Sequence, residues 1–393
     1  MEMEKMQSII NENEDVVYHK KISRELVDLF SQFDEKKANR IDDCASTLIF
    51  KMDLDTGNRK LVSANFCQDR FCPECSKRKS RVMYHNLKQV LEKSYNEQKQ
   101  NFIHLVLSLK NCKKENLNVA LDQLLGGFKR MMKRKKFKTS INGWYRNLEV
   151  TYNEKEDTLH PHLHVILVVD DNYFKRYSQK YLTQSFIKRE FGDACRVDYL
   201  PTVYIKKVYS KDERNNLHGL IAEASKYVTK VSDVLNLKNK DLKLELLKAL
   251  STGLHGRRMS SYGGTLKEIF KQLKLQNEEE ADLLCVENEE IELGNNCVYG
   301  IFVYNKKEEK YVLTRVMDNF AESWEYWRER REERKVIRQR IHEQHINDFK
   351  KGFQQIKHEL AEKVERAREI RNVKETIAEV EKMGNLTLNQ YLI

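Results

Sequence analysis

The segment LHPHLHVILVV (159–169) restricts the fold more strongly than any other part of this 393-residue sequence. In a β-strand, alternate side chains point to opposite faces, so the histidines would share one face and the aliphatic residues the other. Buried imidazoles need hydrogen-bonding partners, and neighbouring imidazoles repel each other when protonated. A bound divalent metal gives the imidazole nitrogens a partner and keeps the rings unprotonated, which ordinary core packing does less well. We therefore predict a strand with metal-binding character at His160, His162 and His164.

The segments around this strand alternate between strand-like and helix-like patterns. Strand composition marks 102–109, 144–153 and 202–209, and helical spacing of apolar residues marks 115–136, 177–191 and 216–231. The resulting order, β-α-β-β-α-β-α, predicts an α+β fold with a ferredoxin-like central antiparallel sheet.

Glu149 lies in the strand-like segment LEVTYN (148–153), just before the histidine strand. The polar segment NEKEDT (153–158) predicts a turn, and a hairpin there would bring the Glu149 carboxylate beside the histidines. A carboxylate with two imidazoles forms a mixed nitrogen and oxygen site that leaves metal positions open for water and substrate. Without such a site, Glu149 would be an ordinary strand residue.

Three of the eight cysteines fall within CQDRFCPEC (67–75). In a chain of this size, a C-x2-C turn indicates a metal knuckle or a redox pair before a disulfide framework. Structural zinc requires four thiolate or imidazole ligands in a tetrahedron, and Cys44 is a better fourth ligand than His85. The alternative is a set of unligated thiols. We predict a structural zinc site at Cys44, Cys67, Cys72 and Cys75.

The formal net charge of the chain is +11. Residues 276–393 hold 20 Lys+Arg and 25 Asp+Glu, so the positive excess belongs to residues 1–275. Such an excess suggests nucleic acid as a partner, although charge alone fits a merely soluble basic protein equally well. The cations beside the cysteines that could contact phosphate are Arg70, Lys77, Arg78, Lys79 and Arg81. The basic run KRMMKRKKFK (129–138) could follow the DNA backbone through Lys129, Arg130, Lys133, Arg134, Lys135 and Lys136, and a solvated helix face is an equally good interpretation of each.

Several functions are not expected from the sequence. No apolar segment approaches the roughly 20 residues of a membrane span, and the polar N-terminus carries no signal-peptide core. We therefore expect a cytoplasmic protein with no membrane partner. The sequence holds no G-x-x-x-x-G-K-[ST] motif, so we expect no ATP-driven helicase within it.

The segment EASKYVTK (223–230) places Glu223 and Tyr227 one turn apart if it is helical. Tyrosine is a weak nucleophile because its pKa is near 10, so that about one in a thousand is ionised at neutral pH. A lysine such as Lys230 and a nearby metal could lower the free-energy cost of ionisation. By spacing alone, packing is the better interpretation of Tyr227.

Together and in this order, the segments resemble the HUH endonucleases. More narrowly, they resemble the single-tyrosine replication initiators (Rep) of small bacterial plasmids that replicate by rolling circle. The resemblance covers roughly 41–275. Two features depart from it, because LSL (107–109) replaces a usually threonine-rich stretch and residues after 320 have no counterpart. The matching segments are CQDRFCPEC with SKRKSR, FIHLVLSL, LEVTYN with HPHLHVILVV, EASKYVTK and LHGRRMSSYGGTLKEI.

The resemblance implies a role for each candidate residue. Tyr227 would attack the scissile phosphate and stay joined to the 5′ end of the DNA. Lys230 would stabilise the developing charge, and Glu223 would activate water for the closing cleavage. His160 would contact DNA or a metal ligand rather than the metal itself. The implied ligands of Mg2+ or Mn2+ are Glu149, His162 and His164.

The implied activity is that of a metal-dependent, site-specific DNA endonuclease and strand transferase. The enzyme would bind the double-strand origin of a plasmid, nick one strand through a 5′-phosphotyrosine, and cleave and join again to terminate replication. Its partners would be origin DNA, a host helicase and a host DNA polymerase. One alternative is an HUH relaxase or single-tyrosine transposase. Another is a non-enzymatic zinc-containing DNA-binding regulator.

The sequence divides the chain into five expected parts. In the last, apolar residues keep a three-four spacing from Phe349 to Val380, which predicts an amphipathic helix. Such a helix would mediate a homodimer or pack on its own domain, and the pattern favours neither. The parts are an N-terminal extension (1–40), a Cys-rich zinc-binding element (41–95), an HUH nicking and DNA-binding domain (96–275), an acidic linker with a small β-hairpin (276–319) and a charged amphipathic helical tail (320–393).

Overall fold

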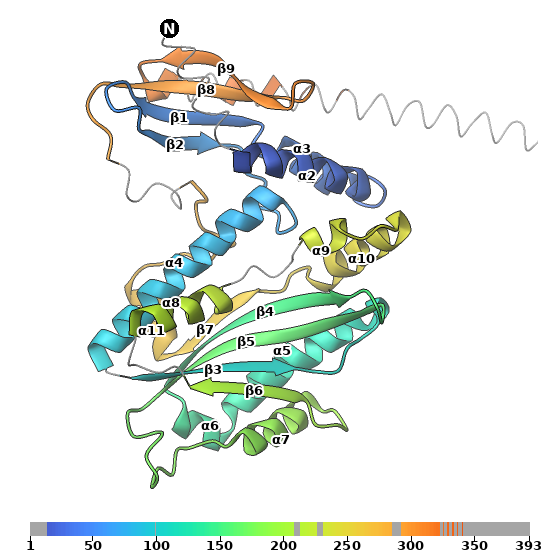
Figure 1. The fold of residues 1–393 in the computed structure, drawn as a ribbon, viewed down its shortest axis with the longest axis vertical. Coiled ribbons are helices and arrows are strands. Elements are labelled where there is room, and N and C mark those ends of the chain that lie inside the picture. The colour runs from blue at the N-terminus through green and yellow to red at the C-terminus, as the bar shows by residue number, and fades with distance from the viewer. Residues whose placement is uncertain are drawn as a thin grey trace, which may run out of the picture. The chain divides into compact units, whose positions relative to one another are not determined.

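The contacts of the chain divide it into two compact units, Met1–Asp318 and Asn319–Ile393. The fold of the first unit carries the candidate site, and the amphipathic helix predicted in the second lies outside the described residues. The computed structural model (Figure 1) describes residues 14–98, 100–207, 213–225, 231–284 and 292–322, together with residues 325, 328, 329, 332, 333, 336 and 340.

The candidate site rests on a five-stranded sheet in the order β6-β3-β5-β4-β7. Each neighbouring pair of strands is antiparallel. The strand β5 lies at the centre because its run of aliphatic residues suits a strand that is covered on both faces. The strands are β3 (Asn101–Ser108), β4 (Gly143–Asn153), β5 (Thr158–Val169), β6 (Thr202–Lys207) and β7 (Ser260–Gly264).

One face of this sheet is covered by α5 (Leu117–Lys133) and α7 (Gln184–Cys195), as Figure 1 shows. Leu163 of β5, Leu121 of α5 and Phe191 of α7 belong to one buried cluster. Burying a side chain of this size contributes about 1.5–3 kcal/mol, so packing of this face against α5 and α7 stabilises the sheet.

The opposite face of the sheet carries the histidines. It is covered by α4 (Pro73–Gln98), α8 (Glu213–Ala224) and α11 (Thr265–Gln272). Ile166 of β5 and Leu91 of α4 belong to a second buried cluster, which these helices share. The polar residues of β5 therefore lie at one end of a face that is otherwise apolar.

The predicted α+β class and the antiparallel central sheet are confirmed. The elements β3, α5, β4, β5, α7, β6 and α8 also follow one another in the predicted order. The helix predicted over 177–191 instead begins at Gln184, because Thr183 caps it by accepting a hydrogen bond from the backbone N–H of Phe186. A short helix, α6 (Lys135–Ser140), separates α5 from β4.

A second, antiparallel sheet in the order β2-β1-β8-β9 joins segments that lie far apart in the sequence. The hairpin predicted in VYGIFVYN and KEEKYVLTRV is present as β8 and β9, and β8 pairs with the whole of β1. Phe302 of β8 lies edge-on to Phe50 of β1. The strands are β1 (Thr47–Asp53), β2 (Arg59–Ala64), β8 (Cys297–Asn305) and β9 (Lys310–Met317).

The remaining helices connect these layers. Among the residues that the structure describes, no helix combines the length and the hydrophobicity that a membrane crossing requires. The helices outside the two sheets and the helical layers named above are α2 (Glu14–Phe30), α3 (Glu35–Asp43), η1 (Lys114–Asn116), α9 (Val231–Leu235) and α10 (Lys240–Gly253).

Two adjacent glycines in α5 test how closely α5 packs on α7. A Cβ atom on Gly127 would lie 2.2 Å from Cys195 Sγ, whereas a Cβ atom on Gly126 would lie 3.0 Å from the guanidinium of the flexible Arg130 side chain. We expect Gly127→Ala to lower the free energy of unfolding by about 1–3 kcal/mol through overpacking. Gly126→Ala should raise it by about 0.5–1 kcal/mol through lower chain entropy in the unfolded state.

Urea denaturation of both variants measures these changes. Gly126→Ala is the matched control, since the same substitution is made one residue away in the same helix. Equal effects of the two substitutions would contradict the close packing of α5 on α7.

Candidate metal and catalytic site

The β4–β5 hairpin places Glu149 beside the histidines. Glu149 lies directly opposite His162 in the antiparallel register, and His164 follows two residues later on the same face of β5. The Glu149 Oε2 atom lies 3.0 Å from His164 Nε2 and 3.3 Å from His162 Nε2. The structure thus brings together the three residues that the sequence predicts as metal ligands, and their ligand roles remain predictions.

Contacts at the other ring nitrogen fix the orientation of His162. Its Nδ1 lies 3.1 Å from the backbone carbonyl oxygen of His160, and because a carbonyl can only accept, this nitrogen donates the proton. In the neutral ring, Nε2 then presents a lone pair to the Glu149 carboxylate. These two electron-rich atoms repel each other in that state, so either a second proton on Nε2 forms a hydrogen bond to Glu149, or a cation bound by both atoms takes the place of that proton. The donor set therefore fits a bound cation.

The three side chains also have the charge and spacing of a divalent metal site. Their ligand atoms lie within 4.8 Å of one another. Burial alone would raise the pKa of Glu149, but hydrogen bonds to His162 and His164 outweigh it and hold the pKa well below its usual range. The carboxylate is therefore ionised at neutral pH. Three protein ligands leave the other positions of an ion open for water and a substrate oxygen.

His104 of β3 is a fourth histidine at this site, and the sequence interpretation missed it. Its Nε2 lies 3.4 Å from His164 Nδ1, and the two rings stack with centroids 5.6 Å apart. Burial and the neighbouring His164 lower the pKa of His104 to about 4, so the ring is neutral at neutral pH. Alternation in FIHLVLSL shows which residues share a face with His104, but only the pairing of β3 with β5 shows that this is the histidine face.

His160 has a different environment. Its Nδ1 lies 2.7 Å from Asn111 Oδ1. His160 does not belong to the group of ligand atoms around Glu149.

The helix α8 brings Glu223 to the histidine face. Its apolar residues Leu220 and Ile221 pack in the same cluster as Ile166 of β5. The charge of Glu223 acts on His104, where it partly offsets the lowering of the histidine pKa by burial. Tyr227 and Lys230 lie outside the described residues.

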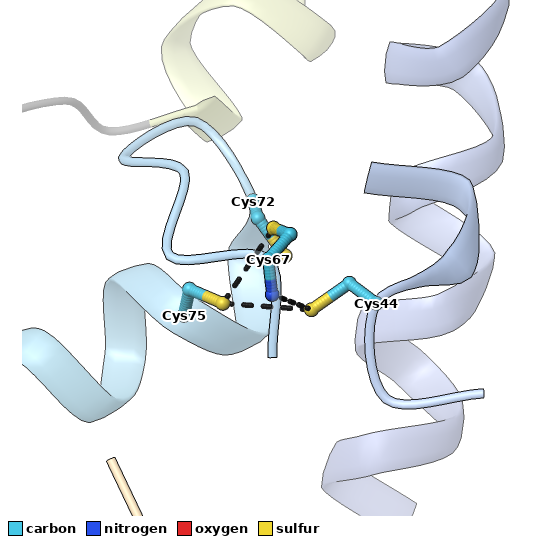
Figure 2. Close-up of side chains that lie close together, drawn as sticks. All are labelled: Cys44, Cys67, Cys72 and Cys75. Carbon is cyan, nitrogen blue, oxygen red and sulfur yellow. Dashed lines mark hydrogen bonds between the residues drawn. The ribbon is translucent and has the colours of Figure 1, made fainter. Parts of the chain in front are cut away.

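The four predicted cysteines converge, as Figure 2 shows. Cys44 follows α3, and Cys67 lies in the loop after β2. Cys72 immediately precedes α4, and Cys75 lies in its first turn. Cys75 Sγ lies 3.4 Å from Cys44 Sγ and 3.7 Å from Cys67 Sγ. These distances exclude a disulfide, which requires about 2.05 Å. They are close to the edge of about 3.8 Å of a tetrahedron with Zn–S bonds of 2.3 Å.

The surroundings of the sulfurs also suit thiolates. The backbone N–H groups of Cys67 and Asp69 donate to Cys44 Sγ and Cys67 Sγ at 3.4 Å. Lys20 of α2 is buried beside the group and donates to the Cys44 carbonyl oxygen at 2.7 Å. The four sulfurs can therefore hold a metal ion, whereas His85 does not belong to the group.

Two basic residues considered as phosphate contacts have structural roles instead. Arg78 is buried and donates to Glu74 at 2.6 Å, and Lys79 is buried and forms an ion pair with Glu279. Arg78 also donates to the carbonyl oxygen of Leu283. The prediction for Arg78 and Lys79 was wrong because charge in a sequence does not reveal burial.

A family comparison covers the part of the chain that holds the five-stranded sheet and the candidate site. The model of the replication protein family matches residues 58–312, a range that contains both Glu149 and the histidines. The chain therefore belongs to the replication protein family. The matched range includes three of the four clustered cysteines, and Cys44 precedes it.

Curated relatives lead to the same conclusion. A protein rep of Bacillus amyloliquefaciens is 37% identical over 293 residues, which cover 71% of this chain and 85% of the relative. A protein rep of Streptococcus pneumoniae is 33% identical over 299 residues, which cover 75% of this chain and 90% of the relative. A replication protein of Staphylococcus aureus is 35% identical over 191 residues, which cover 48% of this chain and 80% of the relative. No solved structure gives a significant match.

His104 should matter for metal binding although it is not a predicted ligand. Replacing it with phenylalanine preserves ring stacking on His164 but removes the nitrogen that faces His164 Nδ1. Loss of such an outer contact typically weakens metal affinity about 10–100-fold. We expect this loss for Mn2+, measured by electron paramagnetic resonance titration. Unchanged Mn2+ affinity would show that His104 does not orient His164, and the exposed His255→Phe is the control.

Proposed function

We propose that this protein initiates rolling-circle replication of a plasmid by nicking one strand at the double-strand origin. The observation that carries the proposal is the convergence of Glu149, His162 and His164 on one face of an antiparallel sheet. Family membership supports a role in replication, and the positive net charge supports a DNA substrate.

The proposed nicking step uses Tyr227 as the nucleophile. Its phenol oxygen attacks the scissile phosphorus, a P–O bond to tyrosine forms, and the bond to the 3′ oxygen breaks. The phenol proton leaves to solvent or a base, and the 3′ oxygen takes up a proton to become the hydroxyl that primes a polymerase. Mg2+ or Mn2+ at Glu149, His162 and His164 would polarise a phosphate oxygen and orient the phosphate for in-line attack.

Two further residues assist this chemistry in the proposal. Lys230 stabilises negative charge at the phosphate or the phenolate. Glu223 accepts a proton from water in the closing cleavage, so that the last strand is released without a second tyrosine. The position of Glu223 near His104 supports this role, because His104 contacts the candidate ligand His164.

The proposed partners follow from the reaction. Origin DNA, single-stranded or in a hairpin at the nick, is the substrate. A host helicase unwinds the duplex and a host DNA polymerase extends the 3′ hydroxyl, and the protein acts in the cytoplasm. The predicted helix at 320–393 is a candidate for homodimer formation.

We also propose that the four-cysteine group holds structural zinc. Four sulfur ligands without an open position are typical of structural rather than catalytic zinc. The hydrogen bond to Cys67 raises the pKa of the Cys44 thiol, and that to Cys44 raises the pKa of Cys72. Thiols so close together cannot all ionise unless a cation is bound.

The nucleophile can be tested with a labelled single-stranded oligonucleotide that carries the nick region, in the presence of Mn2+. Wild-type protein should form a covalent adduct that survives denaturing electrophoresis, and Tyr227→Phe should form none because it lacks the phenol oxygen. A persistent adduct in Tyr227→Phe would sink the assignment. Tyr18→Phe, at an exposed tyrosine of α2, is the matched control.

The same assay separates the role of Glu223 from that of Tyr227. Glu223→Gln should form the adduct at a normal rate but slow the closing cleavage about 10²–10⁴-fold, the usual contribution of a general base. Normal closing cleavage in this variant would exclude Glu223 as the base.

The zinc site predicts a metal content of about one zinc ion per chain in purified protein. Cys72→Ser should lose this zinc and unfold at a lower temperature, because binding energy at a structural zinc site contributes to folding. Inductively coupled plasma mass spectrometry and thermal denaturation measure the two effects. Cys112→Ser is the control, since Cys112 lies outside the group. Zinc retained in Cys72→Ser would reject the site.

A further inference from the structure

A strongly basic surface lies at the end of α5, on α6 and on the adjoining loop between β5 and α7. We call it the α6 basic surface. Six cationic side chains on it are exposed to solvent. They are Lys133, Lys135, Lys136, Lys138, Lys175 and Arg176.

The surface is held in shape by contacts below it. Lys136 Nζ donates to the carbonyl oxygen of Gln179 at 2.5 Å, which ties α6 to the loop. Phe137 of α6 stacks on Phe186 of α7 with ring centroids 6.0 Å apart. The buried Tyr173 hydroxyl accepts a hydrogen bond from the Leu182 backbone N–H and closes the loop. The cations are therefore presented by a defined scaffold.

Nearby acids do not neutralise the exposed cations. Glu190 pairs with Arg134 at 2.5 Å, and Asp170 pairs with Lys180. Within the described part of the chain, neither of these acids forms an ion pair with any of the six cations. Asp171 is an exposed acid in the loop and reduces the local charge by one. The remaining charge is still strongly positive.

Two exposed tyrosines lie in the same loop as Lys175 and Arg176. Tyr177 is 78% exposed and Tyr181 is 49% exposed, and both lie in the loop beside Lys175 and Arg176. Exposed aromatic rings among cations provide the two contacts that single-stranded DNA needs, namely stacking on bases and neutralisation of phosphates. Duplex DNA would use only the cations, because its bases are already stacked.

This surface is distinct from the candidate metal site. It adjoins α5, α6 and α7, which lie on the sheet face opposite to the histidines. It also lies near the Val169 end of β5, seven residues beyond His162. At about 3.3 Å per residue, these residues span roughly 20 Å along the strand. One continuous strand of DNA is long enough to contact both places.

We infer that the α6 basic surface is a second DNA-binding site, which holds single-stranded DNA away from the nick. The lysines contact phosphates, and Tyr177 stacks on an unpaired base. The inference rests on the proposed function for the source of the single strand, because nicking and unwinding expose it. Holding this strand keeps the reaction product on the protein while replication proceeds.

The cations can be tested with full-length protein and a fluorescently labelled oligothymidylate of roughly 20 nucleotides, which has no nick site. The triple variant Lys133→Ala, Lys135→Ala, Lys138→Ala should bind about tenfold more weakly at physiological salt. The slope of log affinity against log salt should fall by about 2, since each single-strand phosphate contact contributes about 0.7. The matched control replaces the exposed Lys267, Lys271 and Lys274.

The tyrosine gives an independent measurement. Tyr177→Ala should weaken oligothymidylate binding roughly 5–100-fold at unchanged salt slope, the effect of losing one stacked base. Tyr177→Phe should bind like wild type, because phenylalanine keeps the ring. Tyr18→Ala is the control at another exposed tyrosine. All variants should melt at the wild-type temperature.

Two results would overturn the inference. One is wild-type affinity and salt slope in both the lysine variant and Tyr177→Ala. The other is a loss of affinity that affects only duplex DNA of the same length, which would show that the surface binds double-stranded DNA. The adduct assay tests the proposed function separately. An adduct that persists in Tyr227→Phe would reject Tyr227 as the nucleophile without changing the conclusions from these binding measurements.

Discussion

The register of β4 against β5 is the constraint on which the candidate site depends. Glu149 faces His162 only in this register, and a slip by one residue would turn every side chain of β5 to the other face. Leu163 and the aliphatic residues that alternate with the histidines are buried against α5 and α7. A slip would move the histidines into the apolar cluster with α5 and α7, where their imidazoles would lack hydrogen-bonding partners, so the hydrophobic face of the sheet fixes the geometry of its polar face.

The helix α4 connects the two groups of candidate metal ligands. Its first turn carries Cys75, and Leu87 and Leu91 further along pack over the histidine-bearing face of the sheet. A tetrahedral zinc site with four thiolates would carry a net charge of −2, which is costly to bury unless cations lie nearby. Lys20 places one such cation beside Cys44. The helix α4 therefore begins at the cysteine group and covers the sheet with its later turns.

The sequence predicted those parts of the structure that depend on local pattern. Alternation in 159–169 was sufficient to place the histidines on one face, and the cysteine spacing was sufficient to group three of the four sulfurs. His104 was missed because its role depends on the pairing of β3 with β5, which no local pattern specifies. For the same reason the β8–β9 hairpin was predicted but its pairing with β1 was not. The roles of Tyr227 and Lys230 came from resemblance alone.

Burial decides which of the many positive charges can act on DNA. Arg78 and Lys79 stand in a basic segment, yet each is buried and pairs with a glutamate, so their field is largely neutralised inside the protein. Lys135 and Lys138 stand in a similar basic segment but are exposed on a short helix. Phosphate binding gains free energy by releasing counterions from the DNA, and only solvent-exposed cations can replace those counterions. The net charge of the chain therefore overstates the charge available to DNA, and the exposed cations determine where DNA can bind.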